Sequence, residues 1–282
     1  MTSPLPRTAL YGLGIIGSRV AANLASAGFP LATWNRTPKP DAPGWVSDPA
    51  AAAVGAGFHQ VFVKDAAAVH SVLDAILPVL EPGAVVAIHA TIHPDEMRLA
   101  AERVFRAGGE AIDAPFTGSR EAAAAAKLVY YLAGEPATIE RARPWLAASS
   151  RDQTVFEGIG TASAIKIATN TITASIVQAL AEALAVTRAA GVPAAELQRA
   201  VKGNACRSGT SDLKLATMID GDFTPHFSLD NMLKDVRFAL DLASQSGATL
   251  PALSHTAAVM EKLASQPENA ALDFSALAKQ FG

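Results

Sequence analysis

Apolar and polar residues alternate up to about residue 157 in a pattern typical of strands separated by helices. Short apolar or β-branched runs are separated by alanine-rich segments of helical length. The runs that we predict as strands are Ala9–Tyr11, Leu31–Trp34, Gln60–Val63, Ala84–His89 and Glu110–Asp113. Because strand, helix and strand repeat in this order, the pattern predicts a mostly parallel, doubly wound α/β sheet.

The alternation continues through two further runs and then stops. Lys127–Ala133 and Gln153–Phe156 flank a segment that opens with a proline and predicts a helix at Pro136–Ala148. After Gly158-Ile159-Gly160 the pattern is helical almost throughout, at Thr161–Ala190 and near 194–202, 211–220, 228–246, 251–265 and 273–281. We therefore predict an α/β domain at residues 1–158 and an all-α domain at residues 159–282.

The first helix of the predicted all-α domain is unusually long, at about 30 residues or roughly 45 Å. Its mixture of Ala, Ile, Thr and Ser predicts burial on several faces, including contact with a second copy of the chain. Its longest uncharged stretch, Ile167–Ala181, contains Asn170 and Gln178 and is shorter than the roughly 20 apolar residues that span a membrane. We therefore expect a buried core helix.

The composition excludes several function classes. Half of the 282 residues are apolar, which predicts a folded chain. With 23 basic and 26 acidic residues the formal net charge is −3, so no cationic excess favours nucleic acid or a membrane surface as a partner. Cys206 is the single cysteine and cannot form an internal disulfide, and the N-terminus lacks the order of a signal peptide. These features predict a cytoplasmic protein.

A glycine-rich motif follows the first predicted strand directly. The sequence Gly12-Leu13-Gly14-Ile15-Ile16-Gly17 opens a helix that we expect to run to about Ala27. Gly12 permits a tight turn, Gly14 lets a pyrophosphate reach the backbone, and Gly17 lets the helix pack on the strand. The helix N-terminus supplies N–H groups for the phosphates. The motif and its position predict a dinucleotide-binding (Rossmann) domain.

The end of the second predicted strand indicates which dinucleotide is preferred. It reads Trp34-Asn35-Arg36-Thr37, without the carboxylate that usually holds the ribose 2′-hydroxyl of NAD. Asn35 is uncharged, whereas Arg36 offers a planar fork suited to a 2′-phosphate and Thr37 offers a hydroxyl. NADP(H) is therefore favoured over NAD(H), and the alternative is that Arg36 is an ordinary surface arginine.

Four segments of the chain form a pattern that extends beyond the glycine-rich motif. They are GLGIIGSRVAANLASAGFPLATWNRT at 12–37, DAPFTGS at 113–119, GIGTASAIKIATN at 158–170 and KDVRFALDLA at 234–243. Together they resemble the β-hydroxyacid dehydrogenase family of the 6-phosphogluconate dehydrogenase superfamily, which includes 3-hydroxyisobutyrate dehydrogenases. The resemblance spans nearly the whole chain. It implies an NADP-binding Rossmann domain followed by a helical substrate and oligomerisation domain, through which family members form dimers or tetramers.

The resemblance assigns Lys166 as the catalytic lysine and Asn170 as the residue that orients the substrate. The two are four residues apart on a predicted helix, so both project from one face. A lysine among Ala, Ile and Thr residues is costly to bury, and apolar surroundings favour the neutral amine that suits proton transfer. From the residues alone, the alternative that Lys166 extends to the surface is equally open.

The segment at 113–119 matches the family's substrate-binding segment. The resemblance implies that Thr117 and Gly118 hold the substrate carboxylate, and Thr117 keeps the hydroxyl of the family's serine. Ser119 replaces a glycine and Phe116 replaces a smaller residue. We keep Ser119 as a substrate-binding candidate through its N–H group, and we expect a smaller or differently shaped pocket.

Three further residues are candidate cofactor contacts. The resemblance places Thr91 and Lys234 near the nicotinamide, and His93 departs from the family pattern beside Thr91. Val63 ends the third predicted strand, where ligands bind in sheets of this kind. For Lys234, the alternative is an ordinary solvated charge pair with Asp235.

The histidines do not indicate a metal site. His89 and His93 lie at the carboxyl end of the fourth predicted strand, where either is a candidate acid or base. We favour the alternative, a strand-end residue and a helix-entry residue before Pro94. The other histidines have no ligand spacing, so we predict no metal; they are His59, His70, His226 and His255.

These features predict an NADP(H)-dependent oxidoreductase acting on a short 3-hydroxy acid or semialdehyde acid, with Lys166 as general acid and base. One alternative is an NADPH-dependent imine reductase, because such enzymes resemble this family in fold and fingerprint. They generally lack the lysine equivalent to Lys166, which counts against this alternative. Another is a non-catalytic NADP-binding sensor. The sequence does not identify the substrate, and we expect Asn231, Met232 and Phe227 to shape the pocket from the helical domain.

Overall fold

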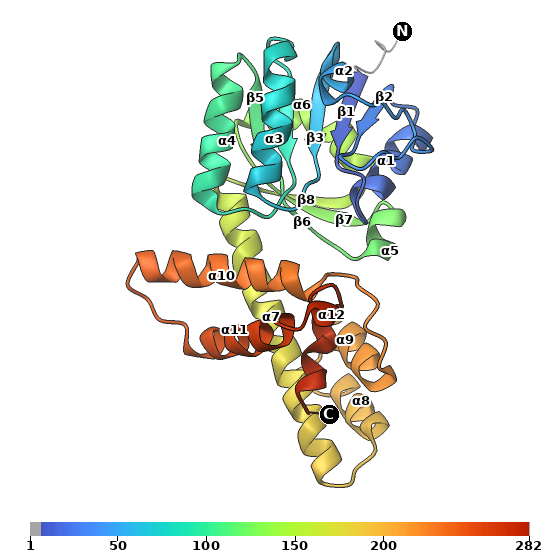
Figure 1. Cartoon of the computed structure of the whole chain (residues 1–282), viewed down its shortest axis with the longest axis vertical. Coiled ribbons are helices and arrows are strands. Elements are labelled where there is room, and N and C mark those ends of the chain that lie inside the picture. Colours follow the sequence, from blue (N-terminus) through green and yellow to red (C-terminus); the bar gives the residue numbers. More distant parts are fainter. Residues whose placement is uncertain (1–6, 282) are drawn as a thin grey trace. The chain divides into compact units, whose positions relative to one another are not determined.

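Within residues 7–281, which the computed structural model describes, eight strands form one mixed sheet (Figure 1). Neighbouring strands follow the order β2-β1-β3-β4-β5-β7-β6, and β8 pairs with β7. The pairs that join β1 to β5 are parallel, as predicted, whereas β7 is antiparallel to β5 and β6 and parallel to β8. The strands are β1 (Arg7–Tyr11), β2 (Leu31–Trp34), β3 (Ala56–Val61), β4 (Val85–Ile88), β5 (Glu110–Asp113), β6 (Phe116–Thr117), β7 (Leu128–Ala133) and β8 (Ser150–Phe156).

Helices cover both faces of this sheet, which confirms the predicted doubly wound α/β class. Successive strand residues point to opposite faces, so the sheet borders two cores. Tyr11 and Val86 pack with residues of α3 and α4, whereas Leu10 and Ala87 pack with residues of α1 and α6. The helices are α1 (Gly17–Ser26), α2 (Pro49–Ala53), α3 (Ala66–Ile76), α4 (Pro94–Arg106), α5 (Arg120–Ala124) and α6 (Pro136–Ala147), with a 3₁₀ turn η1 (Leu77–Val79).

The helix starts follow the local sequence. Pro94 and Pro136 are the first residues of α4 and α6, where a missing N–H group costs nothing. His93 precedes α4, and its side chain accepts a hydrogen bond from the N–H of Asp95 at 3.3 Å. His93 is therefore the helix-entry residue that the sequence predicts.

Some elements differ from the prediction. β3 begins at Ala56 and ends at Val61, so that Val63 follows the strand instead of ending it. The two-residue strand β6 and the short helix α5 were not predicted, because neither is long enough to show a period. The last predicted helix, at 273–281, is a 3₁₀ helix, η2 (Phe274–Phe281).

The chain divides into two compact units between Lys166 and Ile167. The long helix α7 (Thr161–Ala189) crosses this division, whereas the predicted domain boundary at 158–159 precedes the helix. The other helices of the second unit are α8 (Ala194–Lys202), α9 (Gly209–Asp220), α10 (Leu229–Gln245), α11 (Pro251–Ala264) and α12 (Pro267–Ala270).

The second unit has an apolar core of its own, built from α7 to α11 and η2. Met232 is 1% exposed and belongs to this core. Its side chain therefore packs within the second unit, and its expected part in shaping the substrate pocket stays a prediction. The core also contains an ion pair, in which the Lys214 ammonium lies 2.7 Å from the Asp273 carboxylate.

Helix α7 is only partly buried. Its length and composition would allow it to cross a membrane, yet core helices of soluble proteins meet the same criterion, and 33% of its most apolar window is buried in this chain. Ile172 and Val186 are 61% and 70% exposed. Among residues 7–281, the helix that was expected to be buried at 167–181 therefore keeps Ile172 exposed, and Val186 is exposed beyond this stretch.

Candidate functional site

The carboxyl ends of the first four parallel strands meet at one edge of the sheet. Gly12 follows β1, Asn35 follows β2, and Thr91 follows β4 after a short segment. Val63 comes after β3, and its side chain lies 3.3 Å from where a Cβ on Gly12 would stand. The sheet therefore gathers the predicted cofactor residues of the first unit at the edge where ligands bind in open α/β sheets.

The glycine-rich loop has the conformation that a dinucleotide requires. Gly12 has a φ of 97°, and a Cβ there would collide with the carbonyl oxygen of Phe62. A Cβ on Gly17 would collide with the carbonyl oxygen of Gly12, so the first turn of α1 packs directly on the loop. A Cβ on Gly14 would have no neighbouring side chain or backbone atom within 4 Å. The backbone at Gly14 is thus open to a phosphate, and the residues present fit a dinucleotide.

Asn35 connects the glycine-rich loop to the end of β2. Its Oδ1 accepts the N–H of Leu13 at 2.8 Å, and its Nδ2 donates to the carbonyl oxygen of Thr37 at 2.7 Å. Lys39, which sequence reasoning missed, donates to the carbonyl oxygen of Leu13 at 2.6 Å. Arg36 is exposed beside them. Asn35 therefore positions the loop, and two cations lie near the end of β2.

His89 is a neutral packing residue. Burial lowers its pKa to about 3, although its bond to a backbone carbonyl opposes the change. Nδ1 lies 2.7 Å from the carbonyl oxygen of Ala114, and the ring stacks on Phe62 with centroids 4.0 Å apart. An imidazole held neutral and enclosed in this way is a strand-end residue, as favoured from the sequence.

The predicted substrate loop joins β6 to α5. Thr117 and Gly118 are exposed, and a Cβ on Gly118 would lie 2.8 Å from a methyl group of Leu128. Ser119 caps α5, because its Oγ accepts the N–H of Ala122 at 3.2 Å. The side chain that replaces the family's glycine is thus engaged by the helix. The altered pocket expected from Ser119 and Phe116 stays a prediction.

A side chain of α1 also reaches α5. Asn23 donates from Nδ2 to the carbonyl oxygen of Ala123 at 2.8 Å. Asn23 lies on the helix whose N-terminus follows the glycine-rich loop, and Ala123 lies on the helix that Ser119 caps. One amide therefore connects the predicted pyrophosphate and carboxylate sites.

Asp113 connects β5 to the start of α7. Its carboxylate accepts the N–H groups of Gly160 at 3.0 Å and Ser163 at 2.9 Å, and the Ser163 hydroxyl at 2.7 Å. Burial raises the pKa of Asp113 to about 6, against these hydrogen bonds, which lower it. Lys166 is half-buried one turn further along α7.

The second unit brings two predicted site residues together through a third. Asn170 donates from Nδ2 to Asp235 at 2.6 Å, and Lys234 donates from Nζ to the other oxygen of Asp235 at 2.6 Å. Asp235 is 1% exposed, and Lys234 also lies 4.9 Å from the centroid of the Phe238 ring. The Lys234–Asp235 pair is therefore not merely a solvated surface pair. Sequence reasoning missed the role of Asp235, although its place beside Lys234 in the fourth segment was a signal.

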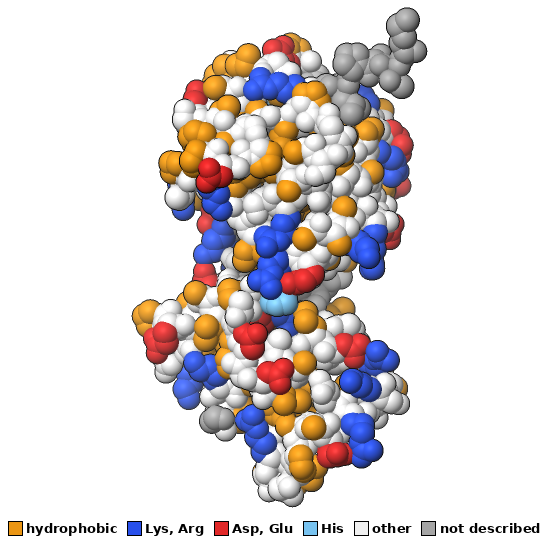
Figure 2. All heavy atoms as spheres, turned by 90° about the vertical axis from the view of Figure 1, so that its right-hand side faces the viewer, with side chains coloured by type: hydrophobic (Ala, Val, Ile, Leu, Met, Phe, Trp, Pro, Cys, Tyr) orange, Lys and Arg blue, Asp and Glu red, His pale blue; other side chains and the backbone are white. Residues whose placement is uncertain are grey.

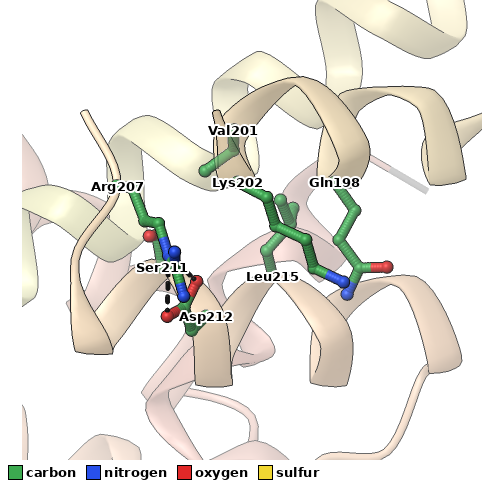
Figure 3. A pocket seen from close by; sticks show the side chains of 7 residues that line it. All are labelled: Gln198, Val201, Lys202, Arg207, Ser211, Asp212 and Leu215. Atoms are coloured by element: carbon green, nitrogen blue, oxygen red, sulfur yellow. Dashed lines mark hydrogen bonds and ion pairs between the residues drawn. The ribbon is translucent and has the colours of Figure 1, made fainter. Parts of the chain in front are cut away.

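The second unit also has a cavity of about 150 Å³ between α8 and α9 (Figure 3). Arg207 and Asp212 form an ion pair at its rim, at 3.1 Å. None of the predicted site residues lines it; the lining residues are Gln198, Val201, Lys202, Arg207, Ser211, Asp212 and Leu215.

The surface charges match the balanced composition. On the face drawn in Figure 2, basic and acidic side chains are interspersed among apolar and neutral ones. Within residues 7–281, the His, Cys, Asp and Glu side chains form no group of three or more that could hold a metal ion.

Comparison with known protein families identifies the chain. The family model described as the NAD binding domain of 6-phosphogluconate dehydrogenase matches residues 7–160. A second model, described as NAD-binding of NADP-dependent 3-hydroxyisobutyrate dehydrogenase, matches residues 160–281. The chain belongs to the β-hydroxyacid dehydrogenase family. It is thus an NAD(P)-dependent oxidoreductase of the 3-hydroxyisobutyrate dehydrogenase type.

Individual β-hydroxyacid dehydrogenases align along most of the chain. A Mycobacterium tuberculosis protein described as a probable 3-hydroxyisobutyrate dehydrogenase is 29% identical over 95% of both chains. The 2-hydroxy-3-oxopropionate reductase of Escherichia coli is 29% identical over 85% of both. The solved structure of M. tuberculosis 3-hydroxyisobutyrate dehydrogenase with L-serine has a TM-score of 0.89 and 26% identity, covering 98% of this chain and 99% of that one.

Reductive aminases share the fold of these dehydrogenases. The structure of one from Aspergillus terreus, in complex with NADPH and ethyl levulinate, has a TM-score of 0.61 at 19% identity. It covers 99% of this chain and 100% of its own. At this identity the likeness concerns the fold alone.

Proposed function

We propose that this protein transfers a hydride reversibly between NADP(H) and a short 3-hydroxy acid or the corresponding semialdehyde acid. The observation that carries the proposal is the fixed amide of Asn170. Because Asp235 accepts from Nδ2, the amide of Asn170 is held in one orientation, with Oδ1 directed away from Asp235. Lys166 lies one helical turn earlier on α7. An amine and an oriented amide at this spacing suit one small carbonyl or hydroxyl group.

In the proposed reaction, the nicotinamide supplies or accepts the hydride when bound. Lys166 donates a proton from Nζ to the substrate oxygen during reduction and takes it back during oxidation. Asn170 orients the same oxygen. Thr117, with its hydroxyl, and the N–H groups of Gly118 and Ser119 hold the substrate carboxylate and so fix the distance of the reacting carbon.

The proposed cofactor contacts begin at the glycine-rich loop. Residues 12–17 hold the pyrophosphate, with the backbone N–H groups that follow Leu13, because those of Gly12 and Leu13 are bonded to Trp34 and Asn35. Arg36 and Thr37 bind the 2′-phosphate of NADP, and Lys39 adds a second positive charge near the end of β2. The loop residues are Gly12, Leu13, Gly14, Ile15, Ile16 and Gly17, positioned by Asn35, and the residues proposed for the nicotinamide end are Val63, Thr91 and Lys234.

Turnover assays with a lysine variant test the proposal. The purified protein is given NADPH with glyoxylate, succinic semialdehyde and tartronate semialdehyde, and NADP with 3-hydroxyisobutyrate. Lys166→Met removes the proton donor at similar volume, and kcat is expected to fall by about 10²- to 10⁴-fold. Lys262→Met, an exposed lysine of α11, is the matched control. Nearly full turnover by Lys166→Met would refute the assignment.

The cofactor preference has its own test. Arg36→Ala is expected to reduce the ratio of kcat/KM for NADPH to that for NADH by about tenfold or more, because a guanidinium paired with a phosphate contributes roughly 1.5–3 kcal/mol. Arg151→Ala is the control, an exposed arginine of β8. A wild-type enzyme that prefers NADH contradicts this part of the proposal.

The same assays separate the two alternatives. A cyclic imine reduced faster than any aldehyde acid identifies an imine reductase. Tight NADPH binding without turnover across the whole carbonyl panel identifies a non-catalytic sensor. Hydroxy-acid or aldehyde-acid turnover that depends on Lys166 contradicts both.

We also propose that the protein is a cytoplasmic homodimer or homotetramer assembled through the helical unit. One face of α7 carries exposed apolar residues that lie four or seven residues apart. They are Ala168, Ile172, Ala179 and Val186. A second copy of α7 would cover this face. Ile172→Glu is expected to shift the sedimentation of the assembly towards the monomer, and unchanged sedimentation counts against this interface.

A further inference from the structure

Asp113 is a fully buried carboxylate that takes no part in the proposed proton transfer but joins two distant segments of the chain. It is the last residue of β5, is fully buried, and reaches residues about 50 positions further along the chain. Its Oδ2 accepts both backbone N–H groups, of Gly160 and Ser163, while Oδ1 accepts the Ser163 hydroxyl. The carboxylate therefore binds the N-terminus of α7 through three hydrogen bonds, two of them to backbone N–H groups at the end of the chain segment where helices leave such groups unpaired.

The residue after Asp113 is fixed as firmly. Ala114 donates its N–H to the carbonyl oxygen of Ile88 at 2.9 Å, and its own carbonyl oxygen lies 2.7 Å from Nδ1 of His89. The loop with Thr117 begins two residues later. Asp113 and Ala114 thus form a rigid base from which the proposed substrate loop extends.

The residue before α7 also lies against α4. Gly160 has a φ of 94°, and a Cβ there would lie 2.6 Å from Nη1 of Arg98 and 3.2 Å from the carbonyl oxygen of Pro94. Thr91 lies just before α4. Gly160 therefore allows α7 to begin close to α4 while Asp113 holds it from β5.

We propose that Asp113 is a positioning residue. By binding the first turn of α7, it fixes the position of Lys166 along and around the helix axis relative to the loop that carries Thr117. Lys166 is three residues after Ser163, which places it about 4.5 Å further along the helix axis. A rotation or shift of the first turn therefore moves the amine by a similar amount. This inference rests on the function proposed above.

The test compares three variants with different hydrogen-bonding capacity. Asp113→Ala removes all three bonds, and kcat is expected to fall by about tenfold or more, since small displacements of a reacting group are costly. Asp113→Asn can still accept both N–H groups with its oxygen and donate to the Ser163 hydroxyl, so at least about a third of kcat is expected to remain. Ser163→Ala loses one bond, with an expected decrease of about two- to fivefold. For all three, the NADPH dissociation constant is expected to stay within about threefold of the wild-type value, because the glycine-rich loop is unchanged.

A matched control separates positioning from general destabilisation. Val69→Ala removes two methyl groups from a fully buried residue of α3 and is expected to lower Tm without lowering kcat. An equal loss of kcat in Val69→Ala at a similar loss of Tm overturns the proposal. So does an Asp113→Asn enzyme as inactive as Asp113→Ala, because charge, not hydrogen bonding, would then be the requirement.

Hydrogen exchange of the backbone amides at 160–166 provides a readout that needs no turnover. Faster exchange is expected in Asp113→Ala and Ser163→Ala but not in Asp113→Asn. If Asp113→Ala does not fold, Ser163→Ala decides, and unchanged kcat with unchanged exchange overturns the proposal. If the wild-type protein turns over no substrate, the proposed function fails, whereas the exchange data still report whether Asp113 holds the helix.

Discussion

Asp113 and Asp273 are buried carboxylates, one in each unit of the chain, with different partners. Asp273 faces the ammonium of Lys214 at 2.7 Å and accepts the N–H groups of Phe227 and Ser275. Among residues 7–281, the hydrogen-bond partners of Asp113 are the uncharged donors of residues 160–163. Burial is similar at the two sites, so the partners account for the contrast.

The pKa values follow this contrast. Burial raises the pKa of Asp113 to about 6, and the hydrogen bonds reduce the effect without reversing it. At Asp273 burial also acts to raise the pKa, but the charge of Lys214 and the hydrogen bonds outweigh it and hold the pKa below its usual range. At Asp273 the cation stabilises the buried carboxylate as an ion, whereas at Asp113 the neutral donors do not outweigh the effect of burial.

The largest expected effect comes from removing the cation at Asp273. Lys214→Met is expected to lower the free energy of unfolding by about 3–5 kcal/mol, because the carboxylate is left buried without its counter-ion. Urea unfolding at pH 7 measures the loss. Lys262→Met, at an exposed position, is the control and is expected to change stability by less than about 0.5 kcal/mol.

A double variant sharpens this result. Lys214→Met with Asp273→Asn removes both charges while keeping an acceptor for backbone N–H groups, so it is expected to be more stable than Lys214→Met alone. A double variant no more stable than the single one contradicts the view that unpaired charge is the cause.

The two carboxylates are expected to respond to pH with opposite sign. The pKa of Asp113 is raised from 3.8 to about 6, so the folded state holds this proton more tightly than the unfolded chain. Wild type is therefore expected to gain stability relative to Asp113→Asn as pH falls from about 6 to about 4, by about 3 kcal/mol in total. The pKa of Asp273 is lowered, so its stabilisation is present above about pH 4 and is lost below it.

Thermal and urea unfolding between pH 3 and 7 measure how the stabilisation by Asp113 and the stabilisation by Asp273 change with pH. Burial lowers the pKa values of His59 and His89 to about 4 and about 3, so both titrate in this range. Each variant retains both histidines, so subtraction removes their contribution. A stability difference between wild type and Asp113→Asn that does not change with pH contradicts the raised pKa.

A smaller effect is expected at Asp235, which combines both kinds of partner. Its carboxylate accepts from the amide of Asn170 and from the ammonium of Lys234. Asp235→Asn can satisfy only one of the two donors, so kcat is expected to fall by about three- to tenfold, equivalent to roughly 0.7–1.4 kcal/mol. Steady-state kinetics measure the change. Asp241→Asn, further along α10, is the control. An equal decrease of kcat in both variants contradicts a specific role for Asp235.

The sequence predicts those parts of the molecule that depend on neighbours along the chain. The position of the Gly12–Gly17 motif after a strand, the start of α7 at Thr161 and the parallel pairing of β1 to β5 all follow from local patterns. Antiparallel β7 was not indicated, because its run of apolar residues is the same in either direction.

The contacts that organise the candidate site join residues far apart in sequence. Leu13 meets Asn35 across 22 residues, Asp113 meets Ser163 across 50, and Asn170 meets Asp235 across 65. A hydrophobic period specifies which face of an element is buried but not which distant polar group it meets there. The individual residues were therefore predictable as candidates, whereas their partners required the folded chain.

The bond from Asn23 to Ala123 has a consequence for how ligands influence one another. The amide lies on the helix beside the glycine-rich loop, and its acceptor lies on the helix that follows Ser119. A dinucleotide phosphate that shifts α1 on binding would also shift the start of α5, where Ser119 is proposed to help hold the organic acid. We therefore expect the affinity for each of these two ligands to depend on the other through this one carboxamide.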